Sequence, residues 1–333
     1  MCMITVEHVA QLANRRVLVV GDVVLDEYLY GKPERLSREA AIPVLEFEQR
    51  RIIPGGAANP AANITALGSN AGIVALIGAD QAGQELANAL HKRKVSTAGL
   101  LRDEQRPTTT KTRILASVQL TVAQQVARLD KIDRRPVDPA FEDQAIELLG
   151  QLIPQVDAVL CSDYRVGWLS ERLIQHIQQL CQQYQTLLTV DSQGRFEPYA
   201  GADFLKCNLG EAEAWLGQRL TNDQQVEQGL ERLRDQLKLA AVVITRGGAG
   251  FSLLDPAGIH HIPAVPIGEV FDATGAGDTF IATATLSLCA GHSPLIAAQL
   301  ANTAAALVVR RIGVATVSPN ELQNALIQFG QIV

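Results

Sequence analysis

Short β-branched runs alternate with longer amphipathic segments along most of the chain. This alternation is typical of a parallel sheet whose strands are connected through helices. Near-continuous apolar strands of this kind are buried on both faces, so a ligand meets such a sheet at the carboxyl ends of the strands. Helices are predicted at 81–91 and 171–183, and strands at 17–20, 73–77, 158–161, 187–190, 204–207 and 241–245. The pattern predicts an α/β protein with a doubly wound, mainly parallel sheet.

Two regions, 23–53 and 111–129, interrupt this alternation. They contain short runs of alternating polarity, such as 43–47 and 111–115, without helices between them. Alternation with a period of two residues predicts strands that expose one face. We therefore expect a small β-sheet set apart from the main one, which acts as a lid within a single domain that spans residues 1–333.

Composition and charge narrow the possible functions. Hydrophobic residues make up 47% and charged residues 19% of the 333 residues, and the formal net charge is −6. This charge argues against non-specific nucleic-acid binding, which needs a basic face. We find neither a signal peptide nor an apolar run long enough to cross a bilayer. The five cysteines are scattered without a CxxC pair, which fits a reducing cytoplasm. We expect a cytoplasmic protein that acts on small molecules.

The segment DATGAGD, Asp272–Asp278, carries the most informative chemistry. Gly275 and Gly277 permit a tight turn, and the helix predicted to follow presents unpaired N–H groups to an anion. Asp278 can accept a proton from an attacking hydroxyl while the amides of Gly275, Ala276 and Gly277 bind a transferring phosphoryl group. In the alternative interpretation, Asp278 is a plain helix N-cap and the glycines form a simple turn.

Two further clusters offer groups that suit a polyol. Gly55 and Gly56 precede a predicted helix and let backbone approach a ligand, while Asn59 offers two donors and an acceptor. The alternative is a glycine-rich loop in which Asn59 caps a helix or faces solvent. Asp22 and Asp26 follow the first strand, where each carboxylate can accept two hydroxyl hydrogen bonds. The alternative there is one turn aspartate and one solvated aspartate.

Asn208 and Glu211 follow the strand predicted at 204–207. An amide and a carboxylate at this spacing can organise Mg²⁺ and phosphates, with Glu211 reaching the metal through water. The same spacing equally fits a helix capping box. Neither G-x-x-x-x-G-K-[ST] nor a G-x-G-x-x-G after the first strand occurs. A P-loop nucleotide site is therefore excluded, and an NAD-dependent oxidoreductase is disfavoured.

Taken together, GGAAN at 55–59 and DATGAGD resemble the two signatures of the PfkB or ribokinase family of carbohydrate kinases. The resemblance covers essentially the whole chain. GDVVLDEYLYG, RLSREAAIPVLE and TVSPNEL are most similar to the bacterial heptose-7-phosphate kinases of ADP-heptose synthesis. Other segments in the family's order are TK at 110–111, SDY at 162–164, NLGEAE at 208–213, TRGGAG at 245–250 and ANTAAALVVRRIG at 301–313.

The resemblance implies a ribokinase-like α/β/α sandwich with a β-sheet lid, which this family often uses as a dimer contact. It also implies ATP and Mg²⁺ as cofactors, and Asp278 as the base beside an anion hole at 275–277. Whether a monovalent cation binds near Gly313 and Thr316 stays open. The implied sugar contacts are Asp22, Asp26, Gly55, Gly56, Asn59, Lys111, Asp163 and Arg165. The implied nucleotide contacts are Asn208, Glu211, Thr245, Arg246, Gly247, Gly250, Thr274, Gly275, Gly277 and Asn302.

Two departures from the heptose-phosphate kinases bear on the acceptor. Those enzymes usually carry lysines, which are natural phosphate ligands, where this chain has Val166 and Gln193. The neighbouring Arg165 and Arg195 are candidates to replace them. Three hypotheses stay open: a kinase of a heptose phosphate or related sugar phosphate, a kinase of an unphosphorylated sugar or nucleoside, and a non-catalytic binding protein. A fused nucleotidyltransferase domain is common in the similar enzymes, so in that pathway we expect this chain to need a separate partner enzyme.

Overall fold

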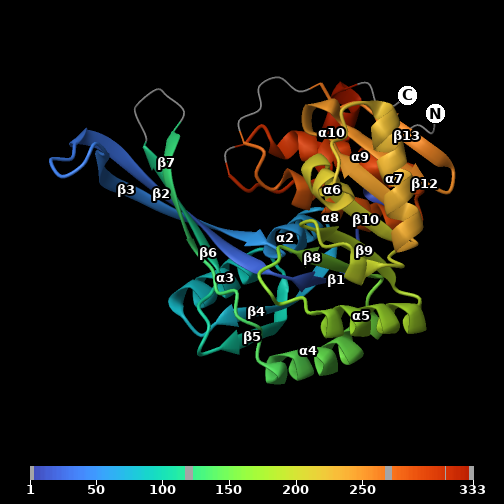
Figure 1. The fold of residues 1–333 in the computed structure, drawn as a ribbon, viewed down its shortest axis with the longest axis horizontal. Helices are drawn as coiled ribbons and strands as arrows, with labels where there is room; N and C mark the ends of the chain where they lie inside the picture. Colours follow the sequence, from blue (N-terminus) through green and yellow to red (C-terminus); the bar gives the residue numbers. More distant parts are fainter. Residues whose placement is uncertain (1–3, 117–122, 267–271, 312, 330–333) are drawn as a thin grey trace.

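Two β-sheets form the framework of the protein (Figure 1). The computed structural model describes residues 4–116, 123–266, 272–311 and 313–329. The main sheet contains β1 (Arg16–Gly21), β4 (Asn70–Gly78), β5 (Ser96–Asp103), β8 (Ala158–Asp163), β9 (Leu187–Ser192), β10 (Phe204–Asn208), β11 (Ala241–Thr245), β12 (Phe251–Asp255) and β13 (Gly258–Ile262). The small sheet contains β2 (Val23–Leu36), β3 (Pro43–Gly56), β6 (Thr110–Ala116) and β7 (Gln124–Lys131).

The strand order of the main sheet identifies where a ligand would bind. The order is β13-β12-β11-β10-β9-β8-β1-β4-β5, and neighbouring strands from β11 to β5 run parallel. The chain builds β4 and β5 on one side of β1 and then returns to place β8 on the other side. The order therefore reverses between β1 and β8, and ligands of such sheets bind in the crevice outside the carboxyl ends at this reversal.

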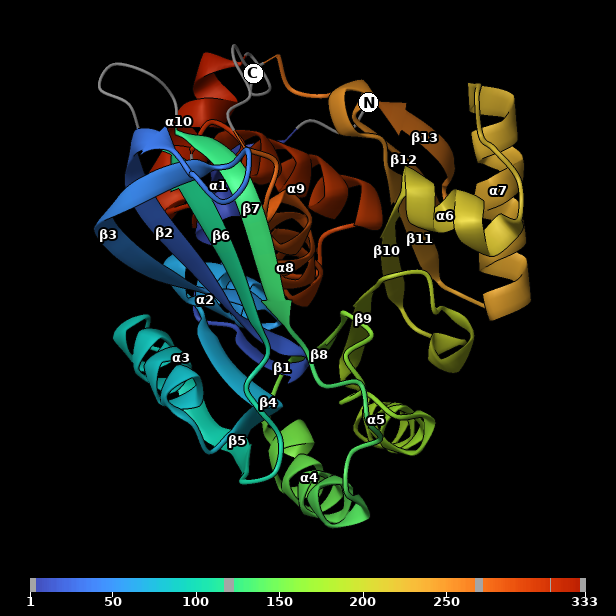
Figure 2. The same ribbon diagram turned by 60° about the vertical axis from the view of Figure 1, so that its left-hand side comes forward.

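Helices cover both faces of the main sheet, which makes three layers (Figure 2). One face packs against α1 (Val6–Ala10), α2 (Ala58–Ala66), α3 (Gln81–Lys92), α8 (Ala276–Cys289), α9 (Pro294–Val308) and α10 (Pro319–Gln328). The other packs against α4 (Pro139–Leu152), α5 (Glu171–Tyr184), α6 (Leu209–Leu216) and α7 (Asp223–Leu237). Short 3₁₀ turns occupy Ile153–Gln155, Glu197–Tyr199 and Gly247–Ala249.

Side chains of the buried strands divide between these two cores. In β1, Val17 and Val19 join the core on the α8 side, while Leu18 and Val20 join the core on the α5 side. This follows from the two-residue period of a strand, whose successive side chains point to opposite faces. It also explains why the sequence shows continuous apolar runs, since both faces are buried. The predicted α/β class, strands and helices are confirmed.

Helix starts agree with the polar residues that precede them. The Asp80 side chain accepts the N–H of Gly83 at 2.9 Å at the start of α3, and Ser170 accepts the N–H of Leu173 at 3.1 Å at the start of α5. Such caps satisfy backbone donors that have no partner within the helix. No helix in the described ranges is long and apolar enough to cross a membrane.

The small sheet projects from the main body as a twisted ribbon (Figure 1). Its order is β3-β2-β6-β7, with β2 antiparallel to β3 and parallel to β6. The prediction of a separate small sheet is confirmed, although residues 117–122 of the expected 111–129 segment lie outside the described residues. At its base, Asp26 of β2 is paired in register with Ile53 of β3 and Lys111 of β6. The small sheet thus brings charged side chains toward the carboxyl end of β1.

Candidate active site

Asp278 lies in the first turn of α8, and its carboxylate is buried against two other parts of the chain. It accepts hydrogen bonds from Asn59 Nδ2 at 2.8 Å and from the Tyr164 hydroxyl at 2.6 Å. The N-cap of α8 is Gly275, so the interpretation of Asp278 as a plain N-cap is wrong. Asn59 is 1% exposed, so the interpretation of Asn59 as solvent-facing is wrong as well.

The Asn59 amide is oriented by its own helix. Asn63, one turn later in α2, donates Nδ2 to the Asn59 side-chain oxygen at 3.0 Å, and Asn63 itself accepts from the Thr279 hydroxyl at 3.3 Å. With its oxygen occupied in this way, Asn59 directs its nitrogen at Asp278. Two asparagines and one threonine therefore fix the position of a single carboxylate.

The surroundings of Asp278 also tune its acidity. Burial, followed by the negative charge of Asp191, raises the pKa of Asp278 to about 6, although the hydrogen bonds from Tyr164 and Asn59 and the charge of Lys206 act in the opposite direction. A carboxylate with a pKa just below neutrality is ionised at pH 7 and still has an appreciable affinity for a proton. This is the property required of a general base.

Two glycines before Asp278 allow other groups to approach closely. Gly275 has φ +84°, and a Cβ there would lie 2.7 Å from Asn59 Nδ2. A Cβ at Gly277 would lie 2.7 Å from Lys206 Nζ. The first turn of α8 consequently lies beside a lysine ammonium, and a helix start with a nearby cation favours a bound anion. Of the expected anion-hole amides, that of Ala276 donates to the Ala273 carbonyl at 3.3 Å.

Lys206 was missed by the sequence reasoning. Its Nζ donates to both carboxylate oxygens of Asp191, at 3.0 and 2.9 Å, and the two side chains are 6% and 12% exposed. Burial opposes the charge, but the charges of Asp191 and Glu211 outweigh it and keep the pKa of Lys206 above its ordinary value. The signal was present, because a lysine inside a buried strand almost always has a charged partner.

Asp22 stabilises a loop instead of presenting free oxygens. It accepts the backbone N–H groups of Tyr164 at 3.0 Å, Val166 at 3.0 Å and Trp168 at 3.1 Å. Burial raises the pKa of Asp22 to about 6 against the effect of these hydrogen bonds. The expected solvated or turn aspartate is therefore a buried one that holds the loop carrying Tyr164. Its role as a sugar contact stays a prediction.

The base of the small sheet meets the same region. Asp26 accepts from Arg113 Nη1 at 2.5 Å, and a Cβ at Gly55 would lie 1.9 Å from the Asp26 carboxylate. Lys111 Nζ lies 5.5 Å from the centre of the Tyr164 ring. Gly56 has φ +57°, and a Cβ there would lie 2.3 Å from the Asp22 carbonyl oxygen. The structure thus brings most of the expected sugar contacts together around Tyr164.

Asp163 and Arg195 are engaged in contacts within the protein, whereas Arg165 faces solvent. Asp163 is buried and accepts from the Tyr199 hydroxyl at 2.9 Å and from the Arg165 N–H at 2.8 Å. Arg195 forms an ion pair with Asp163 at 3.3 Å and also donates to the Leu169 carbonyl. Arg165 is exposed. Because its guanidinium is held by these two partners, Arg195 is poorly placed to replace a phosphate-binding lysine.

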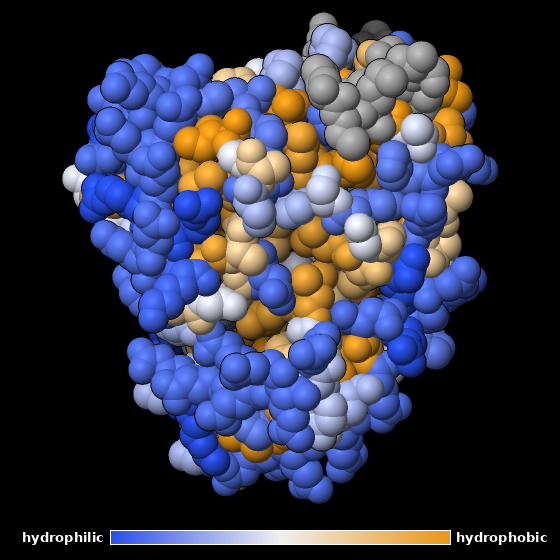
Figure 3. All heavy atoms as spheres, turned by 90° about the vertical axis from the view of Figure 1, so that its right-hand side faces the viewer, coloured by the Kyte–Doolittle hydropathy of each residue, from blue (hydrophilic) through white to orange (hydrophobic). Residues whose placement is uncertain are grey.

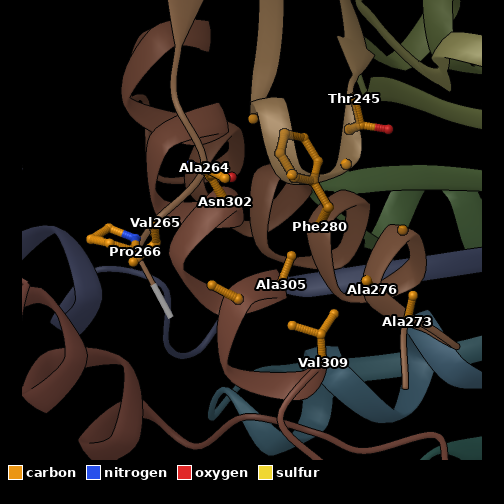
Figure 4. A pocket seen from close by; sticks show the side chains of 15 residues that line it. Thr245, Ala264, Val265, Pro266, Ala273, Ala276, Phe280, Asn302, Ala305 and Val309 are labelled. Atoms are coloured by element: carbon orange, nitrogen blue, oxygen red, sulfur yellow. The ribbon is translucent and has the colours of Figure 1, made fainter. Parts of the chain in front are cut away.

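A cavity of about 470 Å³ begins where α8 starts (Figure 4). Its walls include the predicted nucleotide contacts Thr245, Gly247, Gly250, Gly277 and Asn302, together with the apolar side chains of Val265, Phe280, Ala305 and Val309. On the β12–β13 side of the molecule, apolar side chains gather in the middle of a largely hydrophilic face (Figure 3). An apolar cavity beside an anion-binding helix start suits a nucleotide base whose phosphates point to α8.

Five predicted nucleotide contacts do not line this cavity: Asn208, Glu211, Arg246, Thr274 and Gly275. Arg246 instead forms an ion pair with Asp223 at 2.7 Å, and the Thr274 N–H donates to Asp272 at 2.9 Å. Asn208 and Glu211 form a reciprocal capping box at the start of α6, with bonds of 2.7 and 2.9 Å. The capping-box interpretation is therefore confirmed.

The residues present suit a metal that arrives with phosphates. Within the described ranges, no group of three or more His, Cys, Asp or Glu side chains is placed to hold a metal ion. Glu211 nevertheless lies within electrostatic reach of Lys206 and Asp191. Mg²⁺ keeps several waters and is commonly held by substrate phosphates plus one or two carboxylates. Glu211 and Asp191 fit that limited role.

Comparison with known structures identifies the fold. The chain is similar to phosphofructokinase-2 from Escherichia coli in complex with substrates and products, with a TM-score of 0.79 and 18% identity, covering 95% of this chain and 99% of the other. It is also similar to Arabidopsis thaliana ribokinase complexed with ribose and ATP, with a TM-score of 0.74 and 19% identity, covering 94% and 99%. The fold is ribokinase-like.

Sequence comparison identifies the family. The model described as pfkB family carbohydrate kinase matches residues 14–321. The chain is 37% identical over 315 residues to bifunctional protein HldE of Geobacter metallireducens, covering 94% of this chain and 63% of that protein. It is 36% identical over 309 residues to bifunctional protein HldE of Helicobacter pylori strain P12, covering 92% and 66%. The chain therefore spans less than two thirds of the length of these relatives.

The chain belongs to the pfkB family of carbohydrate kinases, so it is an enzyme that transfers a phosphoryl group to a sugar hydroxyl. The family resemblance found in the sequence is thereby confirmed.

The Lys206–Asp191 pair leads to a stability prediction. Lys206→Met leaves a buried carboxylate without its counter-charge, which typically destabilises a fold by about 3–5 kcal/mol. The double variant Lys206→Met/Asp191→Leu removes both charges and is expected to recover most of this loss. Urea unfolding followed by circular dichroism measures the free energy of unfolding of all three proteins. Equal stability of the single and double variants would contradict the inferred pairing.

Proposed function

We propose that this enzyme transfers the γ-phosphoryl group of ATP to a hydroxyl of a heptose 7-phosphate or a related sugar phosphate. The observation that carries the proposal is the position of Asp278. Its carboxylate accepts hydrogen bonds from Asn59 and Tyr164, and Gly277 of the same helix turn lines the apolar cavity. The relatives named HldE, at 36–37% identity, support a heptose phosphate as the acceptor class.

The proposed reaction proceeds in one displacement. The acceptor hydroxyl gives its proton to Asp278 while its oxygen forms a bond to the γ-phosphorus, and the bond between that phosphorus and the β–γ bridging oxygen breaks. ADP leaves with the electron pair. N–H groups at the start of α8 and the Lys206 ammonium stabilise the negative charge on the transferring oxygens. Bound Mg²⁺ would neutralise charge on the β- and γ-phosphates, with Glu211 as its contact through water.

An unphosphorylated sugar or nucleoside is the alternative acceptor. Val166 and Gln193 stand where the similar enzymes carry lysines, and Arg195 is engaged by Asp163 and a backbone carbonyl. Among the proposed sugar contacts, the remaining cations are then Lys111, whose Nζ lies 5.5 Å from the centre of the Tyr164 ring, and the exposed Arg165. If no other cation reaches the acceptor, a free sugar becomes the better substrate.

A homodimer through the small sheet is part of the proposal. Within the described ranges, most large apolar side chains that face solvent belong to β2, β3, β7 or the turn between β2 and β3. These are Leu36, Ile42, Phe47, Val126 and Leu129, with exposed fractions of 44% to 70%. Exposed apolar groups concentrated on one projecting element are typical of an interaction surface. Pairing two such sheets would cover them.

Two further expectations remain predictions. One is a location in the cytoplasm. The other is a monovalent cation near Gly313 and Thr316, where the Gly313 N–H donates to Asp272 at 2.9 Å. The Thr316 carbonyl oxygen, which could coordinate such a cation, already accepts from Arg311 at 2.7 Å.

The proposed base is tested by Asp278→Asn. We expect kcat to fall by at least about 10³-fold, because the amide cannot take the hydroxyl proton, while ATP affinity changes little. Coupled ADP release with heptose 7-phosphate and its dephosphorylated form measures turnover, and calorimetry measures ATP binding. Near-normal turnover would overturn the assignment of Asp278. Higher kcat/KM for the free sugar would replace the acceptor and leave the base in place.

The pH dependence of kcat/KM tests the environment of the base. Activity requires ionised Asp278, so kcat/KM should rise with pH through about 6 and then level off. Tyr164→Phe removes a hydrogen bond that lowers the pKa of Asp278, and the acid limb should therefore move to higher pH. Asp22 also has a pKa of about 6. The residual activity of Asp278→Asn is the control, and an unchanged acid limb in that variant would assign the titration to another group.

The dimer is tested by placing charges on the small sheet. Phe47→Asp/Leu129→Asp should shift the molar mass measured by light scattering from that of two chains to that of one, because the two carboxylates cannot be buried without partners. Tyr184→Asp, which changes an exposed aromatic residue on α5, is the matched control. A wild-type protein with the mass of a single chain would contradict the proposal.

A further inference from the structure

A second cavity, of about 440 Å³, lies between the base of β3, α2 and the segment that follows α9. It shares no lining residue with the apolar cavity beside α8. Three guanidinium groups line it, those of Arg51, Arg93 and Arg311, whereas no carboxylate does. Asn59 and Thr316 add polar groups to the wall. We call this the arginine cavity.

The positive charges in the arginine cavity are only partly balanced by the protein. Arg311 is paired with Glu321. In the described part of the chain, by contrast, neither Arg51 nor Arg93 forms an ion pair within 4.0 Å, and the Arg93 guanidinium donates only to the Ala89 carbonyl, at 3.2 Å. Burial, followed by the positive charge of Arg51, lowers the pKa of Arg93. Two guanidinium groups thus repel one another beside a cavity that lacks a counter-charge.

We propose that the arginine cavity binds a phosphate monoester, whose oxygens are contacted by Arg51 and Arg93. A phosphate monoester carries nearly two negative charges at neutral pH, which matches the two unpaired guanidinium groups. Planar guanidinium groups bind phosphate oxygens in pairs and with defined geometry. The volume exceeds that of inorganic phosphate and leaves room for part of the group that carries it.

The cavity also borders the proposed site of phosphoryl transfer. Asn59 lines it and donates to the proposed base Asp278 at 2.8 Å. Ile53, another lining residue, is paired in register with Asp26 of β2. A phosphate bound here would therefore share Asn59 with the carboxylate that would take the acceptor proton.

This chemistry is compatible with two sources of the phosphate. The phosphate can belong to the acceptor itself, in which case the inference rests on the proposed function and supplies the cations missing at Val166 and Gln193. It can also belong to a separate phosphorylated small molecule that binds next to the acceptor. In both cases Arg51 and Arg93 contact the phosphate. The binding site is therefore the same, and only the kinetic effect of the phosphate distinguishes the two sources.

Calorimetry tests binding without any reliance on turnover. The protein is saturated with a non-hydrolysable ATP analogue, so that the start of α8 is occupied, and is then titrated with inorganic phosphate and with glucose 6-phosphate at low salt. Arg51→Gln/Arg93→Gln should weaken binding of both probes at least about tenfold, since each lost charge-assisted hydrogen bond contributes strongly. Lys32→Gln/Lys92→Gln removes the same charge from exposed positions outside the cavity and should bind as wild type does.

Equal affinity of the arginine variant and the lysine control would overturn the proposal, as would the absence of binding to wild type. Circular dichroism establishes that both double variants are folded, so a loss of binding is not a loss of structure. A protein that binds phosphate in the cavity but shows no kinase activity would leave this inference standing while the proposed function fails.

Steady-state kinetics then assigns the source. If the acceptor carries the phosphate, the arginine variant should raise KM for the phosphorylated acceptor at least about tenfold, leave KM for its dephosphorylated form unchanged, and abolish competition by inorganic phosphate. If a separate molecule carries it, inorganic phosphate should change turnover at saturating acceptor in wild type and the lysine control only. A variant that shows neither difference would contradict a phosphate site at Arg51 and Arg93.

Discussion

The buried carboxylate of Asp278 joins three parts of the chain that are distant in sequence. Asn59, which donates to it, is 219 residues away, and Tyr164 is 114 residues away. A buried carboxylate must be hydrogen-bonded to be tolerated. The start of α8, the start of α2 and the loop after β8 are therefore held together by hydrogen bonds that also lower the pKa of Asp278.

Other charged side chains near Asp278 stabilise the fold around it. Asp22 accepts hydrogen bonds from three backbone N–H groups of the loop that carries Tyr164. The Lys206–Asp191 pair lies against the first turn of α8. Asp22 and Lys206 are buried and Asp191 is 12% exposed, and each charge is compensated by a partner. Because the loop and the helix start cannot shift without exposing or orphaning these charges, the geometry around Asp278 is set before any ligand binds.

Two cavities of opposite character flank Asn59 and Asp278. The cavity beside α8 is mainly apolar and shares Gly277 with the helix start, whereas the arginine cavity is cationic and shares Asn59 with the proposed base. A nucleotide base is largely apolar, whereas a phosphorylated acceptor is anionic, so each suits a different one of these cavities. Under the proposed function, acceptor identity depends on where unpaired cations lie. Arg51 and Arg93 line the cavity that contains Asn59, far in sequence from Val166 and Gln193.

The sequence alone determined the alternation of strands and helices, the separate small sheet and the family, because residue periods and glycine motifs are local. Spacing could not decide between capping and metal contact for Asn208 and Glu211. It did not indicate that Lys206 would reach the glycine turn. Tertiary structure showed the capping box and the position of Lys206, and it brought Arg51 and Arg93 to one cavity, while the metal role of Glu211 stays a prediction. Contacts between side chains that lie tens to hundreds of residues apart depend on how the layers pack. A local sequence pattern does not specify that packing.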